Sequence, residues 1–140
     1  MLILCASFLE HFDFAYMSNS KKELKKAKHF YFNVWRGNEG PCPAFNGEII
    51  QITRAGWNHL LFSPKRDSAE MFRRLDLLPC ARRIIESARE VKEYRRDGEV
   101  EYWSLERIVK GRKIRVIIRS VKGGPKQFFS VFIKKQIKQK

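Results

Sequence analysis

The feature that most constrains the fold is a series of three turn signals in the second half of the chain. Asp97-Gly98, Lys110-Gly111 and Gly123-Gly124-Pro125 separate four segments that are rich in β-branched and aromatic residues. Short turns of this kind between such segments are typical of β-hairpins. The sequence therefore predicts a four-stranded antiparallel meander, with strands at 91–96, 100–109, 113–122 and 126–134.

The residues before this meander follow the period of helices. Met71, Phe72 and Leu75 recur at helical spacing, and Pro79 breaks the pattern at the point where a second helix begins. Segment 54–62 predicts a short helix or a tight turn, and 18–36 predicts a short basic helix that leads into an extended segment. The fold class that follows is α+β, with N-terminal helices packed on one face of a four-stranded antiparallel sheet.

The N-terminal 17 residues differ in charge from the rest of the chain. They contain no Lys or Arg and two acids, whereas the remainder carries all 29 basic residues and 13 of the 15 acidic ones. We interpret 1–17 as an extension, with an accessory helix as the alternative and with translation starts at Met1 and Met17 both open. Residues 18–140 have the length of one domain.

The net charge of +14 rests on a chain with 44% hydrophobic and 13% aromatic residues. A folded domain of this kind is suited to bind a polyanion, most often nucleic acid. No run approaches 18 apolar residues, so the sequence contains no spanning helix and predicts no membrane partner. The three cysteines fit neither a disulfide framework nor a CxxC metal site, which predicts a cytoplasmic protein with reduced thiols.

Alternation along the strands assigns one sheet face to the helices and leaves the other outside. In the last strand the predicted inward row is Phe129, Val131 and Ile133. The predicted outer face carries Tyr102, Ser104, Glu106, Lys113, Arg115, Arg119, Lys126, Phe128, Ser130 and Phe132. An ordinary solvated surface is the alternative, but residues 101–140 hold 12 basic and two acidic residues, which favours a polyanion-binding face.

This set of side chains is suited to the cleavage of RNA through its own 2′-hydroxyl. That reaction needs a base, an acid and cations around the phosphorane. His59 or Glu106 can exchange protons, although a hydrogen-bonded structural histidine is the alternative for His59. Tyr102 or Phe128 can stack on a base, and Trp57 lies near His59 at an element junction. The histidines lack metal-ligand spacing and no P-loop, GxGxxG or GxSxG is present, so no metal or cofactor is predicted.

Three stretches resemble the phage-associated branch of the barnase, EndoU, colicin and RelE (BECR) nuclease superfamily. They are ITRAGWNHLLF around His59, RRLDLLPCARRII, and RVIIRSVKGGPKQFFSVF near the C-terminus. The resemblance covers about residues 41–134. It implies a compact RNase fold in which helices cover one sheet face and RNA lies on the other.

The resemblance also implies roles for individual residues in metal-independent attack of the 2′-hydroxyl, which gives a cyclic phosphate. His59 is the implied general acid or base, Arg119 a phosphate clamp and Ser130 a hydrogen-bond donor. Lys126 is implied to add charge stabilisation and Glu106 to be a partner base, and the outer-face residues Tyr102, Lys113, Arg115 and Phe128, with Trp57, are predicted to bind RNA. Three hypotheses stay open: a toxin or phage-linked RNA endonuclease, a non-catalytic RNA-binding module, and a toxin-like protein covered by an acidic antitoxin or immunity protein.

Overall fold

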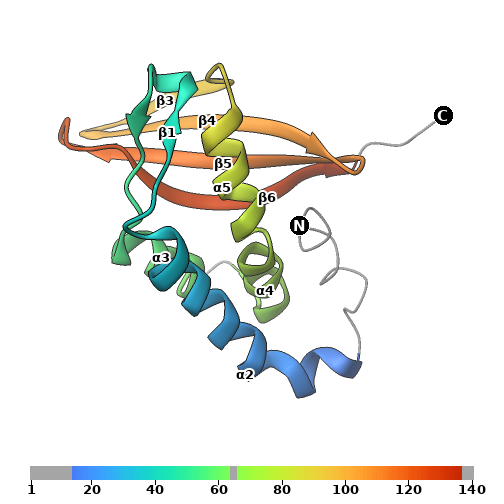
Figure 1. Ribbon diagram of the computed structural model, residues 1–140. Coiled ribbons are helices and arrows are strands. Elements are labelled where there is room, and N and C mark those ends of the chain that lie inside the picture. Colours follow the sequence, from blue (N-terminus) through green and yellow to red (C-terminus); the bar gives the residue numbers. More distant parts are fainter. Residues whose placement is uncertain (1–13, 64–65, 137–140) are drawn as a thin grey trace.

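The computed structural model describes residues 14–63 and 66–136 of the 140-residue chain (Figure 1). Most of the extension predicted at 1–17 therefore lies outside the described residues. Helix α2 (Phe14–His29) crosses the predicted domain boundary at residue 17 and continues directly into η1 (Phe30–Trp35), a π-helix. The prediction of an extended segment after the basic helix is wrong, because a helical turn lets Tyr31 and Trp35 both enter the core.

Three shorter helices follow a small hairpin. The hairpin consists of β1 (Pro41–Cys42), the 3₁₀ turn η2 (Pro43–Phe45) and β2 (Glu48–Ile49). Helix α3 (Arg54–Leu61) confirms the short helix predicted around His59. Helices α4 (Ser68–Asp76) and α5 (Leu78–Ser87) confirm the two consecutive helices predicted to be separated near Pro79. The N-cap of α4 is Asp67, whose carboxylate accepts from the Glu70 amide, so the cap lies one residue before the expected Ser68.

The meander is confirmed. Strands β3 (Glu93–Asp97), β4 (Val100–Val109), β5 (Arg112–Val121) and β6 (Gln127–Gln136) form an antiparallel sheet in the order β3-β4-β5-β6. Lys110 and Gly111 both have positive φ, at 51° and 77°, as a two-residue hairpin turn requires. The α+β class, with helices and a four-stranded antiparallel sheet, therefore agrees with the prediction.

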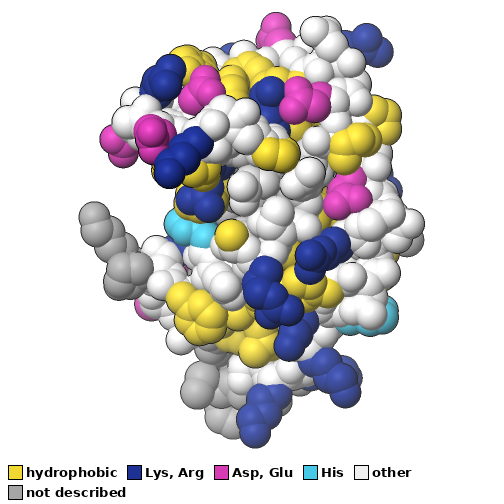
Figure 2. All heavy atoms as spheres, turned by 90° about the vertical axis from the view of Figure 1, so that its left-hand side faces the viewer, with side chains coloured by type: hydrophobic (Ala, Val, Ile, Leu, Met, Phe, Trp, Pro, Cys, Tyr) yellow, Lys and Arg dark blue, Asp and Glu magenta, His cyan; other side chains and the backbone are white. Residues whose placement is uncertain are grey.

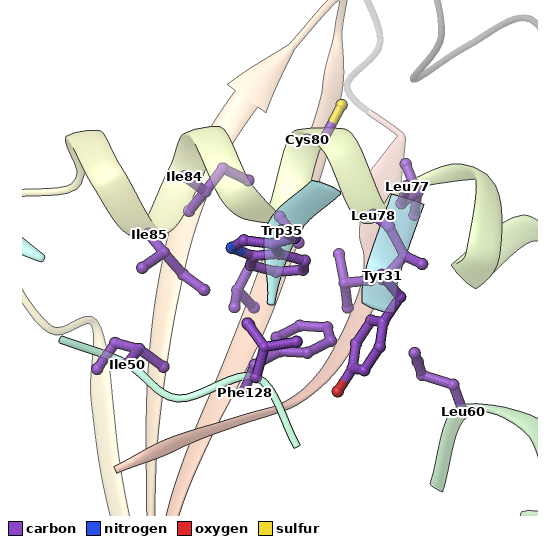
Figure 3. Close-up of a cluster of buried hydrophobic side chains, with 14 of the residues drawn as sticks. Tyr31, Trp35, Ile50, Leu60, Leu77, Leu78, Cys80, Ile84, Ile85 and Phe128 are labelled. Carbon is purple, nitrogen blue, oxygen red and sulfur yellow. The ribbon is translucent and has the colours of Figure 1, made fainter. Parts of the chain in front are cut away.

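Helix α5 crosses one face of the sheet, while α3 and α4 lie along the β6 edge (Figure 1). The core lies beneath α5, where Trp35 and Tyr31 meet Phe128 of β6 (Figure 3). On β5, Ile114, Val116 and Ile118 are fully buried on this side. We call the other side, which carries Tyr102, Ser104, Glu106, Arg115, Ile117, Arg119, Phe129 and Ser130, the open face.

A β-bulge in β6 changes which side chains reach the open face. Ile118 pairs with Phe128 and Ile117 pairs with Ser130, so Phe129 has no partner on β5. Phe128 consequently lies in the core with no exposed surface, whereas Phe129 joins the open face. The predicted places of Phe128 and Phe129 are both wrong, while Val131 and Ser130 lie on the predicted sides.

Cys42 is a buried free thiol, whereas Cys80 is disulfide-bonded, which the cysteine spacing did not predict. The cysteines therefore give no support to the cytoplasmic prediction. Within residues 14–63 and 66–136, no helix combines the length and apolar character needed to cross a membrane.

Candidate nucleic-acid interface

Helix α3 is fixed against β6 by the residues that begin it. The Thr53 hydroxyl caps the helix by accepting from the Gly56 amide and also donates to Gln127 Oε1 at 3.1 Å. The Tyr31 hydroxyl donates to the Thr53 carbonyl at 2.5 Å. A Cβ at Gly56 would lie 2.5 Å from the Phe128 carbonyl oxygen, so only glycine permits this approach.

This anchoring explains four of the five residues in the stretch GWNHL. Gly56 lets the helix approach the sheet, and Trp57 and Leu60 are buried in the core. His59 is left half-buried on the side of α3 that faces Phe129. The imidazole stacks on the Phe129 ring with a centroid distance of 3.8 Å and an interplanar angle of 22°. The bulge in β6 and the short helix α3 together place the histidine at the open face.

Several arginines surround this stacked pair. The Arg119 Cζ atom lies 4.2 Å from the centroid of the Phe129 ring. Arg66 donates to the His59 carbonyl, and Arg74 donates to Ser130 Oγ at 2.7 Å. Across the sheet, Arg95 Cζ lies 4.4 Å from the centroid of the Tyr102 ring, which contacts Phe129 edge-on. Figure 2 shows a histidine in a hollow bordered by Lys or Arg side chains.

We call this region the His59 end of the open face. Its residues are His59, Arg66, Arg74, Arg95, Tyr102, Ser104, Arg119, Phe129 and Ser130. Glu93 and Arg115 line the same hollow from its other side. The structure thus brings together the predicted residues His59, Arg119, Ser130 and Tyr102.

Three buried polar atoms at the His59 end have no hydrogen-bond partner within the described residues. They are Nη1 of Arg66, Nε of Arg119 and Oγ of Ser104. Buried polar groups in native proteins are almost always satisfied, so each such atom needs an explanation. Two of these groups are guanidinium donors, and the hydroxyl can also donate. Each of the three atoms can therefore donate a hydrogen bond to an acceptor that the described residues do not supply.

The environment of His59 keeps its imidazole neutral. Burial, followed by the positive charges of Arg66, Arg74 and Arg119, lowers the pKa of His59 from 6.5 to about 4. A neutral imidazole at pH 7 can accept a proton, as a general base must.

The other end of the open face is neutralised by ion pairs. Arg115 contacts Glu106 directly and Glu93 at 3.0 Å, and Lys134 lies 3.3 Å from Glu106. Lys113 Nζ is 4.0 Å from Glu106 and lines a separate hollow at that end. We call this group of Glu93, Glu106, Lys113, Arg115 and Lys134 the Glu106 end.

The Glu106 end lacks a free acid or base. Burial opposes ionisation of Glu106, but hydrogen bonds and charges from Arg115 and Lys134 outweigh it and lower the pKa of this carboxyl. A hydrogen bond from Arg115 likewise lowers the pKa of Glu93. Both groups are therefore carboxylates at neutral pH, already occupied by cations. The implied role of Glu106 as partner base to His59 is not supported by this arrangement.

Three predicted site residues lie outside the open face. Trp57 is 4% exposed and packs on Tyr31 and Phe32, so its ring is not accessible to RNA. Phe128 is in the core. Lys126 pairs with Glu48 at 2.9 Å and lies over the rings of Phe45 and Trp103, on the helix side of the sheet. The assignments of Trp57, Phe128 and Lys126 to the site are wrong, the last two because the bulge reverses the alternation.

The sequence interpretation missed four residues of the His59 end: Arg66, Arg74, Arg95 and Phe129. The adjacent Phe128 and Phe129 carried one usable signal, because a regular strand cannot bury two neighbouring side chains on one face. Arg95 belongs to the same parity row as Tyr102, its partner across β3 and β4. Arg66 and Arg74 had no such signal, because their approach to the sheet depends on the packing of α4 against β6.

No group of three or more His, Cys, Asp or Glu side chains that could hold a metal ion occurs in the described part of the chain. Comparisons of the sequence with family models and with curated proteins, and of the structure with solved structures, find no match.

Proposed function

We propose that the His59 end binds a phosphodiester of RNA and that the protein is a metal-independent endoribonuclease of the BECR type. The observation that carries the proposal is the convergence of Arg66, Arg74 and Arg119 on a neutral, half-buried histidine. Arg74 pairs with Glu70 at 2.8 Å, whereas Arg66 and Arg119 form no ion pair with a described residue. The three cations repel each other, and an anionic ligand relieves that repulsion. Tyr102, with Arg95 against its ring, offers a stacking surface for a base beside the phosphate.

In the proposed reaction His59 takes the proton of the ribose 2′-hydroxyl. The 2′ oxygen attacks the adjacent phosphorus, and the bond from phosphorus to the 5′ oxygen breaks. The departing 5′ oxygen takes a proton from water, and the resulting hydroxide takes the proton held by His59. The products are a 2′,3′-cyclic phosphate and a 5′-hydroxyl, and the imidazole returns to its neutral form. Arg119, Arg66 and Arg74 stabilise the additional negative charge on the phosphorane.

A non-catalytic RNA-binding module is the second candidate, and one observation favours it. Glu93, which lines the same hollow as His59, and Glu106 are both ionised and paired with Arg115, so neither is free to donate a proton. A site with one base and several cations binds a phosphodiester whether or not it cleaves it. A toxin whose basic open face is covered by an acidic antitoxin is compatible with either candidate.

Incubation of the purified protein with RNA in excess chelator tests the proposal. The expected result is a set of fragments that end in 2′,3′-cyclic phosphate, formed by the parent protein and lost with His59→Ala. Ser130→Ala is expected to slow the reaction less, because Ser130 already accepts a hydrogen bond from Arg74. Salt-dependent RNA binding without fragments would support the binding module instead, and absence of both would overturn the two candidates.

A further inference from the structure

A second basic surface lies outside the His59 end. Lys21, Lys25 and Lys28 of α2, with Phe32 and Arg36, follow one another at separations of three or four residues. This spacing places them along one stripe of the helix that runs from α2 into η1. Arg54, the first residue of α3, joins them, because Arg36 Cζ and Arg54 Cζ lie 5.8 and 5.5 Å from the centroid of the Phe32 ring.

The cations of this stripe are available to a ligand. Lys21, Lys25, Lys28, Arg36 and Arg54 are all exposed, and none forms an ion pair with a residue in the described part of the chain. Glu23 of α2 lines a different hollow, between α2 and the helices α4 and α5. In Figure 2 Lys and Arg side chains gather around hydrophobic ones on the lower part of the face, with no acidic side chain between them.

Figure 2 shows a gathering of Lys and Arg side chains on the same side of the molecule as a hollow that contains a histidine. The distance from Lys21 to Lys28 is about 10 Å at the 1.5 Å rise of a helix, which is long enough for several phosphates of a nucleic-acid strand. The two guanidinium groups over Phe32 present planar surfaces on which unpaired bases stack. An anionic membrane is less suited to this stripe, because Phe32 is its only large apolar side chain and membrane-surface helices need a broad apolar face.

We propose that this stripe binds the phosphate backbone of a second part of the RNA held at the His59 end. The proposal rests on the proposed function for the identity of the ligand. It adds that the preferred ligand is a long or structured RNA that reaches both surfaces, and that a short oligonucleotide occupies only the His59 end. Each neutralised phosphate steepens the dependence of log affinity on log salt by about 0.7–0.9.

The test compares two uncleavable 2′-O-methyl RNAs, a hairpin of roughly 30 nucleotides and a single-stranded hexamer, over a range of salt concentrations. The stripe variant is K21Q/K25Q/K28Q. The matched control, R83Q/R89Q/K92Q, removes the same number of positive charges at exposed positions outside both surfaces. Vesicles with and without anionic lipid form a second arm. Thermal unfolding of each variant confirms that the fold is unchanged.

The stripe variant is expected to bind the hairpin at least about tenfold more weakly, with a salt slope smaller by roughly 2 to 3. Its affinity for the hexamer and the affinity of the control for both RNAs are expected to change less than about twofold. An unchanged hairpin affinity would overturn the proposal, as would equal losses in the stripe and control variants, or a loss confined to anionic vesicles. Arg119→Gln tests the proposed function separately. If the His59 end does not bind RNA, this substitution leaves the affinity for the hexamer unchanged, whereas the stripe variant still loses affinity for the hairpin.

Discussion

Both ends of the open face carry several basic side chains, but the two ends differ in how those charges are satisfied. At the Glu106 end two carboxylates hold Arg115, Lys134 and Lys113 in ion pairs. At the His59 end Arg74 pairs with Glu70, but Arg119 and Arg95 have no carboxylate partner in the described residues, and buried guanidinium and hydroxyl atoms are unsatisfied. The difference shows that a count of basic residues does not locate a binding site. Cations already paired within the fold stabilise it, whereas unpaired ones are available to a ligand.

The largest effect that we expect from substitutions at the two ends of the open face is on RNA cleavage. His59→Ala removes the proposed base and is expected to lower the cleavage rate by about 10²–10⁴-fold, the usual contribution of general base catalysis. Glu106→Gln at the opposite end is expected to change the rate by less than about tenfold, because its carboxylate is already bound by Arg115 and Lys134. Initial rates on one RNA substrate measure both. Equal losses in the two variants would contradict the division of the open face.

Two substitutions that each remove one positive charge, one at each end of the open face, test whether paired and unpaired arginines differ in function. Arg119→Gln is expected to weaken RNA binding by roughly tenfold or more with little change in stability, because its Nε has no partner within the described residues. Arg115→Gln is expected to change RNA affinity by less than about threefold but to destabilise the fold by about 2 kcal/mol, because it leaves the Glu106 side chain, 6% exposed, without its guanidinium. Fluorescence anisotropy and chemical denaturation separate the two effects. The reverse pattern would contradict the account.

The placement of His59 depends on how closely α3 approaches β6. Gly56→Ala puts a methyl group 2.5 Å from the Phe128 carbonyl oxygen and 2.8 Å from the Tyr31 hydroxyl, so either the helix or the tyrosine must move. A loss of about 1–3 kcal/mol in unfolding free energy is expected, together with weaker RNA binding. Ala55→Ser, at the exposed neighbouring position, is the control and is expected to stay within about 0.5 kcal/mol. If both variants have the stability of the parent, the close approach does not position the site.

A further effect is expected on the pH dependence of stability. The pKa of His59 is about 4 in the folded chain and near 6.5 when unfolded, so the unfolded chain takes up the proton first as the pH falls. His59 therefore reduces stability progressively from about pH 6.5 to pH 4. His59→Gln is expected to lose less stability over this range than the parent in parallel denaturation curves. Parallel loss in both proteins would show that His59 is not held neutral by the fold.

The sequence predicted the elements better than it predicted the site. Turn residues such as Gly98 and Lys110-Gly111 act locally, and the four strands and the helices α3, α4 and α5 were found where their patterns indicated. The faces were predicted wrongly only at the start of β6, because one bulged residue reverses the alternation for the side chains before it. That single irregularity moved Lys126 and Phe128 out of the site and Phe129 into it.

His59 and Arg119 were predicted as site residues, but their surroundings were not. The approach of Arg66 and Arg74 depends on contacts between α4 and β6, which are distant in the chain and carry no local pattern. The pairing of Arg115 with Glu106 was equally absent from the sequence interpretation, although the two residues lie opposite each other across β4 and β5. Residue type alone did not separate a cation that a ligand can use from one that the fold already uses.

The most direct test of the central claim is an NMR titration of the His59 imidazole with and without a 2′-O-methyl oligonucleotide. We predict a pKa of about 4 in the free protein, because burial and three arginines disfavour the charged ring. A bound phosphodiester offsets those charges, so the pKa is predicted to rise in the complex. A value near 6.5 in the free protein, or one that the oligonucleotide does not change, would contradict the assignment of the His59 end as the RNA phosphate site.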